Sequence, residues 1–331
     1  MKITMADPTH VHIYNPLPLV LAHFVLQLAD RLESAGRPSI CIPSVNGEVG
    51  RDLRAKALAL GNHVRIARRH VESGAPLIVA WPLLGWLEMP LWRHSTNGSL
   101  IVVHDPEPLV RQHGLSQWTA NLSARLAGPR WPHIVTMSPE AHAIAVKHFD
   151  PKIVHLAPHP MITPPTAHSA DHGRVALVLG QYKPSRDIEA MAAIAEKAQN
   201  AGWNLVVAGR GWPEIPGWTV HSRFLSEDDF RTLLATARVL VLPYRHYFQS
   251  GVALRALESG IPVVGRSSGF LRSVLGEDFP GSVDDWGRPQ SWLDALEAAV
   301  AGRESQLQNA GRYSQQGASE WRALADLAAN G

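Results

Sequence analysis

The sequence has little cysteine, no long hydrophobic run and almost no excess charge. Cys41 is its single cysteine in 331 residues, which excludes an internal disulfide framework and favours a reducing compartment; we expect it to be a small core residue. The longest apolar runs, 17–28 and 77–87, are too short or too interrupted by proline to span a bilayer. The N-terminus lacks the pattern of a secretory signal. We therefore expect a cytoplasmic protein whose membrane contact, if any, is peripheral.

The charge balance argues against a nucleic-acid-binding protein. Lys and Arg number 31 against 29 Asp and Glu, a net charge of +2, far from the excess that such proteins carry. The first half is weakly basic and the second weakly acidic, which points to an acidic acceptor or an anionic surface for the first half. The length exceeds what one hydrophobic core usually supports, so two domains are expected.

Short apolar runs alternate with segments of helical spacing. Strands are expected at 10–14, 39–42, 77–81, 100–104, 134–137, 153–156, 175–179, 205–208, 219–224, 239–242 and 262–265. Helices are expected at 19–32, 51–71, 118–126, 140–149, 188–201, 227–236, 251–259 and from Gln290 onward. This α/β alternation predicts parallel sheets covered by helices. The domains are expected at 1–160 and 174–305, with a linker at 161–173 inside a Pro- and His-rich stretch and a C-terminal segment at 306–331.

The segment 239–266 combines a buried strand, a polar turn, a helix and a second buried strand. Ser250 and Gly251 stand where the helix begins, so the free N–H groups and the dipole of its first turn attract an anion. Gly251 lets that anion approach the backbone closely. The pattern predicts a phosphate site at Ser250, Gly251 and Val252.

The pattern Pro-x(6)-Ser-Gly-Val-x(3)-Ala-Leu-x(2)-Gly-x-Pro-Val-Val of this segment resembles the donor-binding segment of GT-B glycosyltransferases, chiefly family 4 and related exopolysaccharide enzymes. The resemblance covers 175–290 well and the first half in outline. It implies a GT-B fold, two Rossmann-like domains facing each other across a cleft, with the nucleotide-sugar on the second domain and the acceptor on the first. It also implies that the C-terminal helix packs back on the first domain, where Trp321 is a suitable anchor.

The sequence departs from family 4 at one prominent place. That family usually carries Glu-x(7)-Glu here, and those places are held by Tyr247 and Arg255. The resemblance implies that both lie near the donor sugar. It also implies donor contacts at the turn of Gly209 and Gly211 and a nucleoside contact at Arg223, although a plain tight turn explains the glycines equally well.

The turn that follows the strand 175–179 carries basic side chains. In family 4 the corresponding turn supplies two cations to the donor diphosphate; Arg186 matches one of them, Gln181 replaces the other, and Lys183 is available to restore that charge. A guanidinium binds two phosphate oxygens at once and stabilises a leaving diphosphate. The alternative is a solvated loop with ordinary basic residues.

Polar side chains after the first-domain strands are candidates for the acceptor site, because ligands of open α/β sheets bind at the carboxyl ends of strands. His104 and Asp105 follow one strand, and either could take a proton from an acceptor hydroxyl. Alternatively, Asp105 caps the next helix and His104 is merely packed. His12 and Asn15 are candidates at the first strand. The 17 histidines include no His-x(3)-His pair with carboxylates on one helix, so we expect no metal or other cofactor.

One helical region of the first half is crowded with cations: Arg51, Arg54, Lys56, Arg65, Arg68 and Arg69. A Trp-rich segment follows, with Trp81, Trp86 and Trp92. Cations beside amphipathic indoles are typical of a surface that binds anionic membranes. The alternative is a solvated helix beside core tryptophans.

These observations favour a metal-independent glycosyltransferase. It would move a sugar from a UDP- or GDP-sugar to a hydroxyl of a glycan, lipid-linked or small-molecule acceptor, at the inner face of the plasma membrane. Because Tyr247 stands where retaining enzymes of the family carry their first Glu, we expect inversion, with Asp105 as the base. The alternatives are a nucleotide-sugar 2-epimerase, which the lack of acids in the site disfavours, and a non-catalytic partner subunit.

Overall fold

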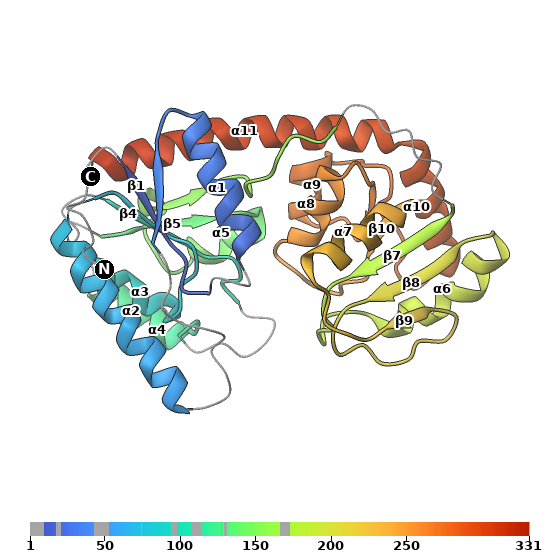
Figure 1. The fold of residues 1–331 in the computed structure, drawn as a ribbon, viewed down its shortest axis with the longest axis horizontal. Helices are drawn as coiled ribbons and strands as arrows, with labels where there is room; N and C mark the ends of the chain where they lie inside the picture. Colours follow the sequence, from blue (N-terminus) through green and yellow to red (C-terminus); the bar gives the residue numbers. More distant parts are fainter. Residues whose placement is uncertain are drawn as a thin grey trace. The chain divides into compact units, whose positions relative to one another are not determined.

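The structure is a computed structural model that describes residues 10–17, 21–42, 53–73, 75–93, 98–107, 114–126, 128, 131–165 and 173–330, with backbone alone at 53–56, 71–73 and 330. The chain divides into two compact units. The first comprises Met1–Pro160 and Gln316–Gly331, and the second Met161–Gln315. Each unit contains one parallel sheet with helices on its faces (Figure 1).

The first unit is built on a six-stranded parallel sheet of order β2-β1-β3-β4-β5-β6. Its strands are β1 Val11–Tyr14, β2 Ser39–Ile42, β3 Leu77–Val79, β4 Ser99–Val102, β5 His133–Thr136 and β6 Val154–Leu156. Its helices are α1 Ala22–Ser34, α2 Leu53–Ser73, α3 Glu88–Trp92, α4 Gln117–Arg125 and α5 Pro139–Ala145, with 3₁₀ turns η1 Gly85–Leu87 and η2 Pro151–Ile153. One core joins the sheet to α1 and the end of the last helix, and a second core joins it to α2, η1, α3, α4 and α5.

The second unit is built on a five-stranded parallel sheet of order β11-β10-β7-β8-β9. Its strands are β7 Val175–Leu179, β8 Asn204–Ala208, β9 Thr219–His221, β10 Val239–Leu242 and β11 Val263–Gly265. Its helices are α6 Ile188–Asn200, α7 Glu227–Thr236, α8 Gly251–Glu258, α9 Gly269–Leu275 and α10 Pro289–Ala301.

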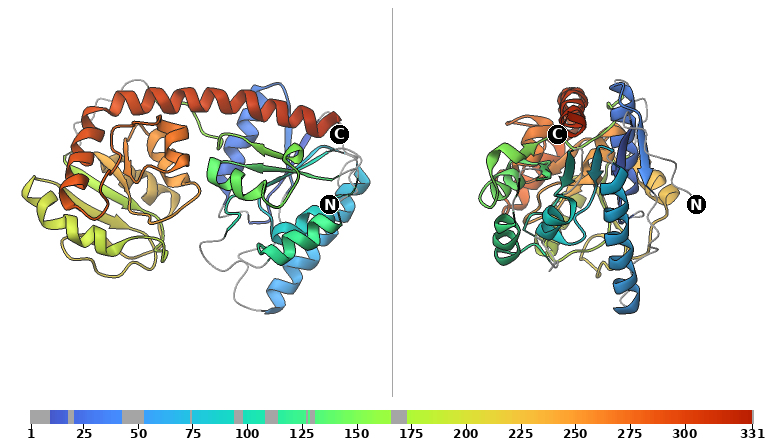
Figure 2. Two further views of the ribbon diagram at one scale, coloured as in Figure 1. Left: turned by 180° about the vertical axis from the view of Figure 1, so that it is seen from behind. Right: turned by 90° about the vertical axis from the view of Figure 1, so that its left-hand side faces the viewer.

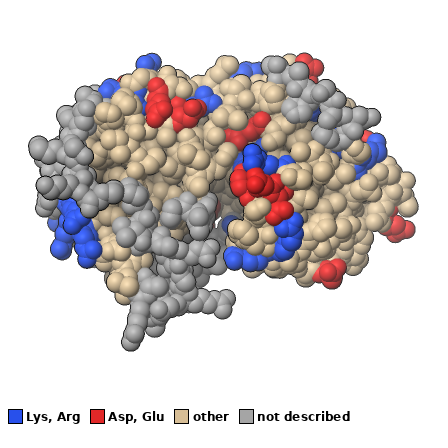
Figure 3. All heavy atoms as spheres, viewed as in Figure 1, with Lys and Arg blue, Asp and Glu red and all other residues tan. Residues whose placement is uncertain are grey.

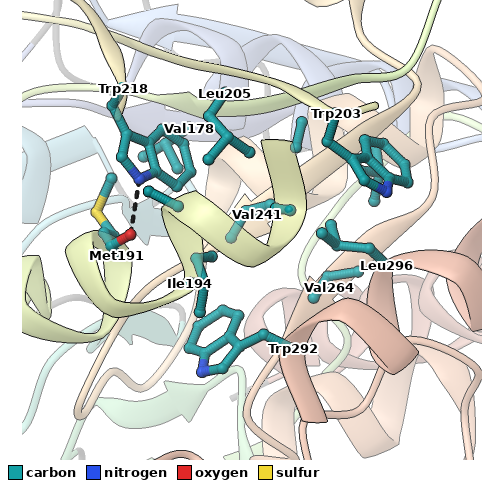
Figure 4. Close-up of a cluster of buried hydrophobic side chains, with 14 of the residues drawn as sticks. Val178, Met191, Ile194, Trp203, Leu205, Trp218, Val241, Val264, Trp292 and Leu296 are labelled. Atoms are coloured by element: carbon teal, nitrogen blue, oxygen red, sulfur yellow. Dashed lines mark hydrogen bonds between the residues drawn. The ribbon is translucent and has the colours of Figure 1, made fainter. Parts of the chain in front are cut away.

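Tryptophans fill the core between this sheet and the helices α6 and α10 (Figure 4). Trp203, Trp212, Trp218 and Trp292 are all buried there. The indole N–H of Trp218 donates to the carbonyl of Met191, at 2.8 Å, so its polar atom is satisfied inside the core. Burial of such large side chains supplies much of the hydrophobic stabilisation of a domain.

The last helix, α11 Arg303–Asn330, contributes to both units (Figure 2). In the second unit, the buried side chain of Gln306 accepts from Val263 N at 2.8 Å and donates to Val263 O at 3.0 Å. In the first unit, Trp321 is fully buried and its indole N–H donates to Pro158 O at 2.8 Å. The anchor role expected for Trp321 is therefore visible in the packing of the first unit.

The predicted elements match the observed ones closely, with a few corrections. The strand expected at 219–224 ends at His221, and the expected helical tail consists of α10 and α11. Gly302 separates these two helices, and a Cβ there would lie only 2.4 Å from Pro280 Cγ. Cys41 is exposed rather than buried, because β2 is an edge strand of its sheet. None of the described helices is long and apolar enough to cross a membrane.

Candidate functional site

Three loops meet at the carboxyl edge of the second sheet, because parallel strands all end on the same edge. They follow β7, β8 and β10, which are neighbours in the sheet. The loops after β7 and β8 are joined where Gly180 N donates to Ala208 O at 3.0 Å. The loop after β10 leads into α8, whose cap is Ser250: its Oγ accepts from Ala253 N at 3.2 Å.

The first turn of α8 lies beside the turn that follows β7. Gly180 has φ +97°, and a Cβ placed on it would lie 3.0 Å from Arg186 Nη2 and 3.7 Å from Val252 Cγ2. Apart from its chain neighbours and the backbone of its own helix, no atom of the described residues lies within 4 Å of the corresponding point at Gly251. The structure therefore brings Arg186 and Val252, far apart in the sequence, to the same glycine turn.

Arg186 is a buried cation, only 5% exposed. Its Nη2 donates to Leu179 O at 2.8 Å, and its guanidinium lies 4.9 Å from the ring centre of Trp212 and 4.7 Å from that of Tyr244. Burial lowers the pKa of Arg186. Its Nε is buried without a hydrogen-bond partner, and none of the ion pairs among the described residues includes it. A buried charge is costly unless paired, so this position favours an anionic ligand and does not fit a solvated loop.

Lys183 and Gln181, two other polar residues of these loops, are more exposed than Arg186. Lys183 is half-buried in the same turn as Arg186, and its carbonyl accepts from Arg186 N at 2.9 Å. Gln181 is exposed and accepts weakly from Arg210 Nη2 at 3.4 Å. Both lie at the edge where the diphosphate was expected.

The glycines after β8 have a packing role. Gly209 has φ +146°, and a Cβ there would lie 2.1 Å from Gly180 O, so only glycine lets the two turns approach. Gly211 has φ +84°. The tight-turn interpretation of this pair therefore accounts for its geometry without a ligand.

The two residues that replace the family's acid pair have partners of their own. Tyr247 is buried, and its hydroxyl accepts from Ser268 Oγ at 3.1 Å. Arg255 forms an ion pair with Glu227 and lies 3.7 Å from the ring centre of Phe230, which ties α8 to α7. The guanidinium of Arg255 is thus engaged within the protein.

Arg223, expected near the nucleoside, is likewise paired. Its Nη1 and Nη2 donate to Asp229 at 2.8 and 3.0 Å. Asp229 also completes the capping box of α7 with Ser226, whose Oγ accepts from Asp229 N at 3.1 Å. Arg223 therefore stabilises the start of α7.

In the first unit, His104 and Asp105 follow β4 as expected. The surroundings of the two residues differ from each other, because His104 is buried and Asp105 is partly exposed. His104 is 4% exposed, donates from Nε2 to Ala80 O at 2.8 Å, and lies against the rings of Phe24 and Trp81. Burial lowers its pKa to about 4, so it is neutral at pH 7. Asp105 is partly exposed. It does not cap α4, whose cap is Ser116.

The two other candidates for the acceptor-substrate site are His12, in β1, and Asn15, in the turn that follows β1. His12 lies inside β1 rather than in the loop after it; it is buried, and its Nδ1 is 3.4 Å from His70 Nδ1. Burial, and to a lesser degree His10, lowers the pKa of His12. Asn15 is buried, and its Oδ1 accepts from Leu17 N at 2.9 Å, which shapes the turn after β1.

Two of the three tryptophans of the Trp-rich segment belong to the core rather than to a membrane surface. Trp86 is 2% exposed and Trp92 1% exposed, so neither indole can enter a bilayer, and the membrane role expected for these two is wrong. Trp81 is partly exposed. The cations Arg65, Arg68 and Arg69 are exposed on α2, where Figure 3 shows a basic patch. Arg51 lies outside the described residues, as do the side chains of Arg54 and Lys56.

Sequence reasoning missed a buried polar network in the same unit. Glu88 is fully buried and accepts from His63 Nε2 at 3.0 Å, from Trp92 Nε1 at 2.7 Å and from Leu84 N at 2.9 Å. His63 Nδ1 lies 3.1 Å from the hydroxyl of Tyr14. An acid within an otherwise apolar segment was the available signal, because a buried carboxylate requires partners. Among the described residues, no cluster of three or more His, Cys, Asp or Glu side chains is arranged to hold a metal ion.

Comparison with known proteins identifies the class. Residues 176–301 match the family described as Glycosyl transferases group 1. No curated protein sequence matches the chain. Sucrose-phosphate synthase from Thermosynechococcus elongatus is 15% identical with a TM-score of 0.64, over 95% of this chain and 97% of that one. HepE from Anabaena, in complex with UDP-glucose, is 11% identical with a TM-score of 0.63, over 96% of this chain and 98% of that one.

TarM is 11% identical with a TM-score of 0.57, and the match covers 80% of this chain but 55% of TarM. At these identities the structural likeness establishes the fold, which is GT-B with two Rossmann-like domains. Together with the match of residues 176–301 to Glycosyl transferases group 1, this fold supports a GT-B glycosyltransferase. The predictions of fold and of enzyme class are confirmed.

Proposed function

We propose that this enzyme transfers a sugar from a UDP- or GDP-sugar to a hydroxyl of a glycan or lipid-linked acceptor, with the donor bound by the second unit. The observation that carries the proposal is Arg186, a buried guanidinium beside Gly180 and the first turn of α8 that pairs with no carboxylate of the described residues. The UDP-glucose held by HepE, which has the same fold, supports a uridine nucleotide.

In this proposal the diphosphate lies against the backbone amides of Ser250, Gly251 and Val252. A helix N-terminus offers free N–H groups and a favourable dipole to an anion. Arg186 adds a full positive charge in a site of low dielectric, where it stabilises the charge that develops as the nucleoside diphosphate leaves. Lys183, in the same turn, is placed to add a second cation from the solvent side.

Arg186→Ala is expected to raise the Kd of UDP or GDP about tenfold or more, because a hydrogen bond to a charged group contributes about 1.5–3 kcal/mol. Isothermal titration calorimetry measures this Kd. The matched control is Arg174→Ala, which removes an arginine that also lies over a tryptophan, 4.7 Å from the ring centre of Trp203, but before β7 rather than after it. An unchanged Kd in Arg186→Ala would refute the donor site.

The main alternative is a non-catalytic partner subunit, which the replacement of the family's acids by Tyr247 and Arg255 favours. Release of UDP or GDP from a nucleotide-sugar in the presence of an acceptor separates the two functions. A partner subunit would bind the nucleotide without turnover, whereas the enzyme releases it in proportion to glycosylated product.

We further propose that exposed cations of α2 hold the first unit on an anionic membrane, at the cytoplasmic face. Each Lys or Arg near such a surface contributes about 1 kcal/mol. Replacing Arg65, Arg68 and Arg69 together by Ser is therefore expected to weaken sedimentation with phosphatidylglycerol vesicles more than tenfold at low salt. Equal binding of this variant and the wild type would contradict the proposal.

The control for the vesicle experiment removes the same charge from the second unit. It carries Ser at three exposed cations: Lys197, Arg231 and Arg288. Because the net charge of the two variants is the same, a difference in their vesicle binding reports which unit carries the membrane-binding surface, not how basic the protein is.

A further inference from the structure

The turn that carries Arg186 is fastened to the loop after β10. Arg186 and Tyr244 form an isolated antiparallel bridge. On either side of it, Asp187 N donates to Pro243 O at 2.7 Å and Arg245 N donates to Ser185 O at 2.8 Å. The position of the guanidinium of Arg186 therefore depends on how firmly these two loops hold together.

One carboxylate lies at the centre of this junction. Asp187 Oδ2 accepts from Arg245 Nε at 2.9 Å and from Trp286 Nε1 at 3.0 Å, and Oδ1 accepts from Arg245 Nη2 at 3.1 Å and from Ala190 N at 3.0 Å. The Asp187 side chain is 9% exposed. The hydrogen bonds from Arg245 are the main reason that the pKa of Asp187 falls to about 2.

These contacts join three parts of the second unit. Arg245 comes from the loop after β10, Trp286 from the segment before α10, and Ala190 from the first turn of α6, which Asp187 caps. The bidentate pair with Arg245 also compensates the negative charge of Asp187. Asp187 therefore does not neutralise the neighbouring Arg186, whose positive charge is available to pair with another anion.

We propose that Asp187 is a positioning residue for the donor site: its pair with Arg245 holds the turn 183–187 so that the guanidinium of Arg186 stays between Trp212 and Tyr244, beside Gly180. The inference rests on the proposed function, which places the donor diphosphate at Arg186. Asp187 itself does not contact the donor in this scheme, and its effect on donor binding passes through Arg186.

The test is Asp187→Asn, measured by calorimetry with UDP and with GDP as probes. Asn caps a helix as well as Asp does, so the substitution removes the charge and the bidentate pair while α6 keeps its cap. The Kd of the nucleotide that the wild type binds is expected to rise about fivefold. Loss of the Asp187–Arg245 pair loosens the turn that holds Arg186, and residues within one such network usually affect each other's contribution. In an Arg186→Ala background the same substitution is expected to change the Kd less than twofold.

Glu297→Gln is the matched control. Glu297 also binds an arginine and an indole, accepting from Arg174 and, at 3.0 Å, from Trp203 Nε1. Arg174 directly precedes β7 and Trp203 directly precedes β8. Both partners therefore lie at the amino ends of the strands, at the edge of the sheet opposite to the proposed donor site. Thermal unfolding of both variants measures the structural contribution, and the Kd of Glu297→Gln is expected to equal that of the wild type.

The outcomes separate the inference from the proposed function. An unchanged Kd in Asp187→Asn, or an equal rise in both backgrounds, overturns the positioning role while the donor site at Arg186 stands. If the wild type binds neither UDP nor GDP, or if Arg186→Ala binds as tightly as the wild type, the proposed donor site fails and the inference fails with it.

Discussion

Asp105→Asn is expected to lower turnover by about 10²- to 10⁴-fold, the usual contribution of a general base, while donor affinity and folding stay near those of the wild type. The expectation follows from the inverting reaction that the replacement of the family's first Glu by Tyr247 favours. Such a displacement needs a group that takes the proton of the acceptor hydroxyl as it attacks. Steady-state assays of nucleotide release, with calorimetry for donor binding, measure the two effects.

The surroundings of Asp105 narrow the choice of base. His104 donates from Nε2 to Ala80 O and is buried against the rings of Phe24 and Trp81, so its ring is held within the protein. Asp105 is partly exposed and is not the cap of α4. In the second unit, Tyr247 stands in the place of the family's first acid, and its hydroxyl accepts a hydrogen bond from Ser268 Oγ.

Glu107→Gln is the control for the base, because Glu107 is an exposed acid two residues further along the same loop. It is expected to retain turnover within about twofold, as surface substitutions usually do. Product NMR adds an independent check. A retained anomeric configuration, or an Asp105→Asn enzyme with most of its activity, would rule out this assignment.

The parts of the fold that could be predicted from sequence are those with local signals. Ser250 was readable as a helix start because a cap acts on amides two or three residues away. The strands were readable because a parallel sheet buried on both faces requires short apolar runs.

What the sequence could not supply was the pairing of residues far apart in the chain. Arg255 looked available for a ligand until the structure placed Glu227 against it. Trp86 and Trp92 suit a membrane interface and a core equally well, since an indole has both an apolar face and an N–H donor. Arg186 lies in the turn after β7, as the sequence predicts, but its burial depends on Trp212 and Tyr244, which come from other loops.

Glu88→Gln is expected to lower the free energy of unfolding by about 3–5 kcal/mol, the cost of breaking a buried polar pair. All three hydrogen-bond partners of Glu88 are donors: His63 Nε2, Trp92 Nε1 and Leu84 N. A carboxylate accepts from all of them, whereas an amide offers one oxygen and turns its own N–H groups toward another donor. Urea unfolding measures the change, and Glu33→Gln on the exposed face of α1 is the control, expected within about 0.5 kcal/mol of the wild type. A loss below about 1 kcal/mol in Glu88→Gln would mean that the network does not stabilise the first unit.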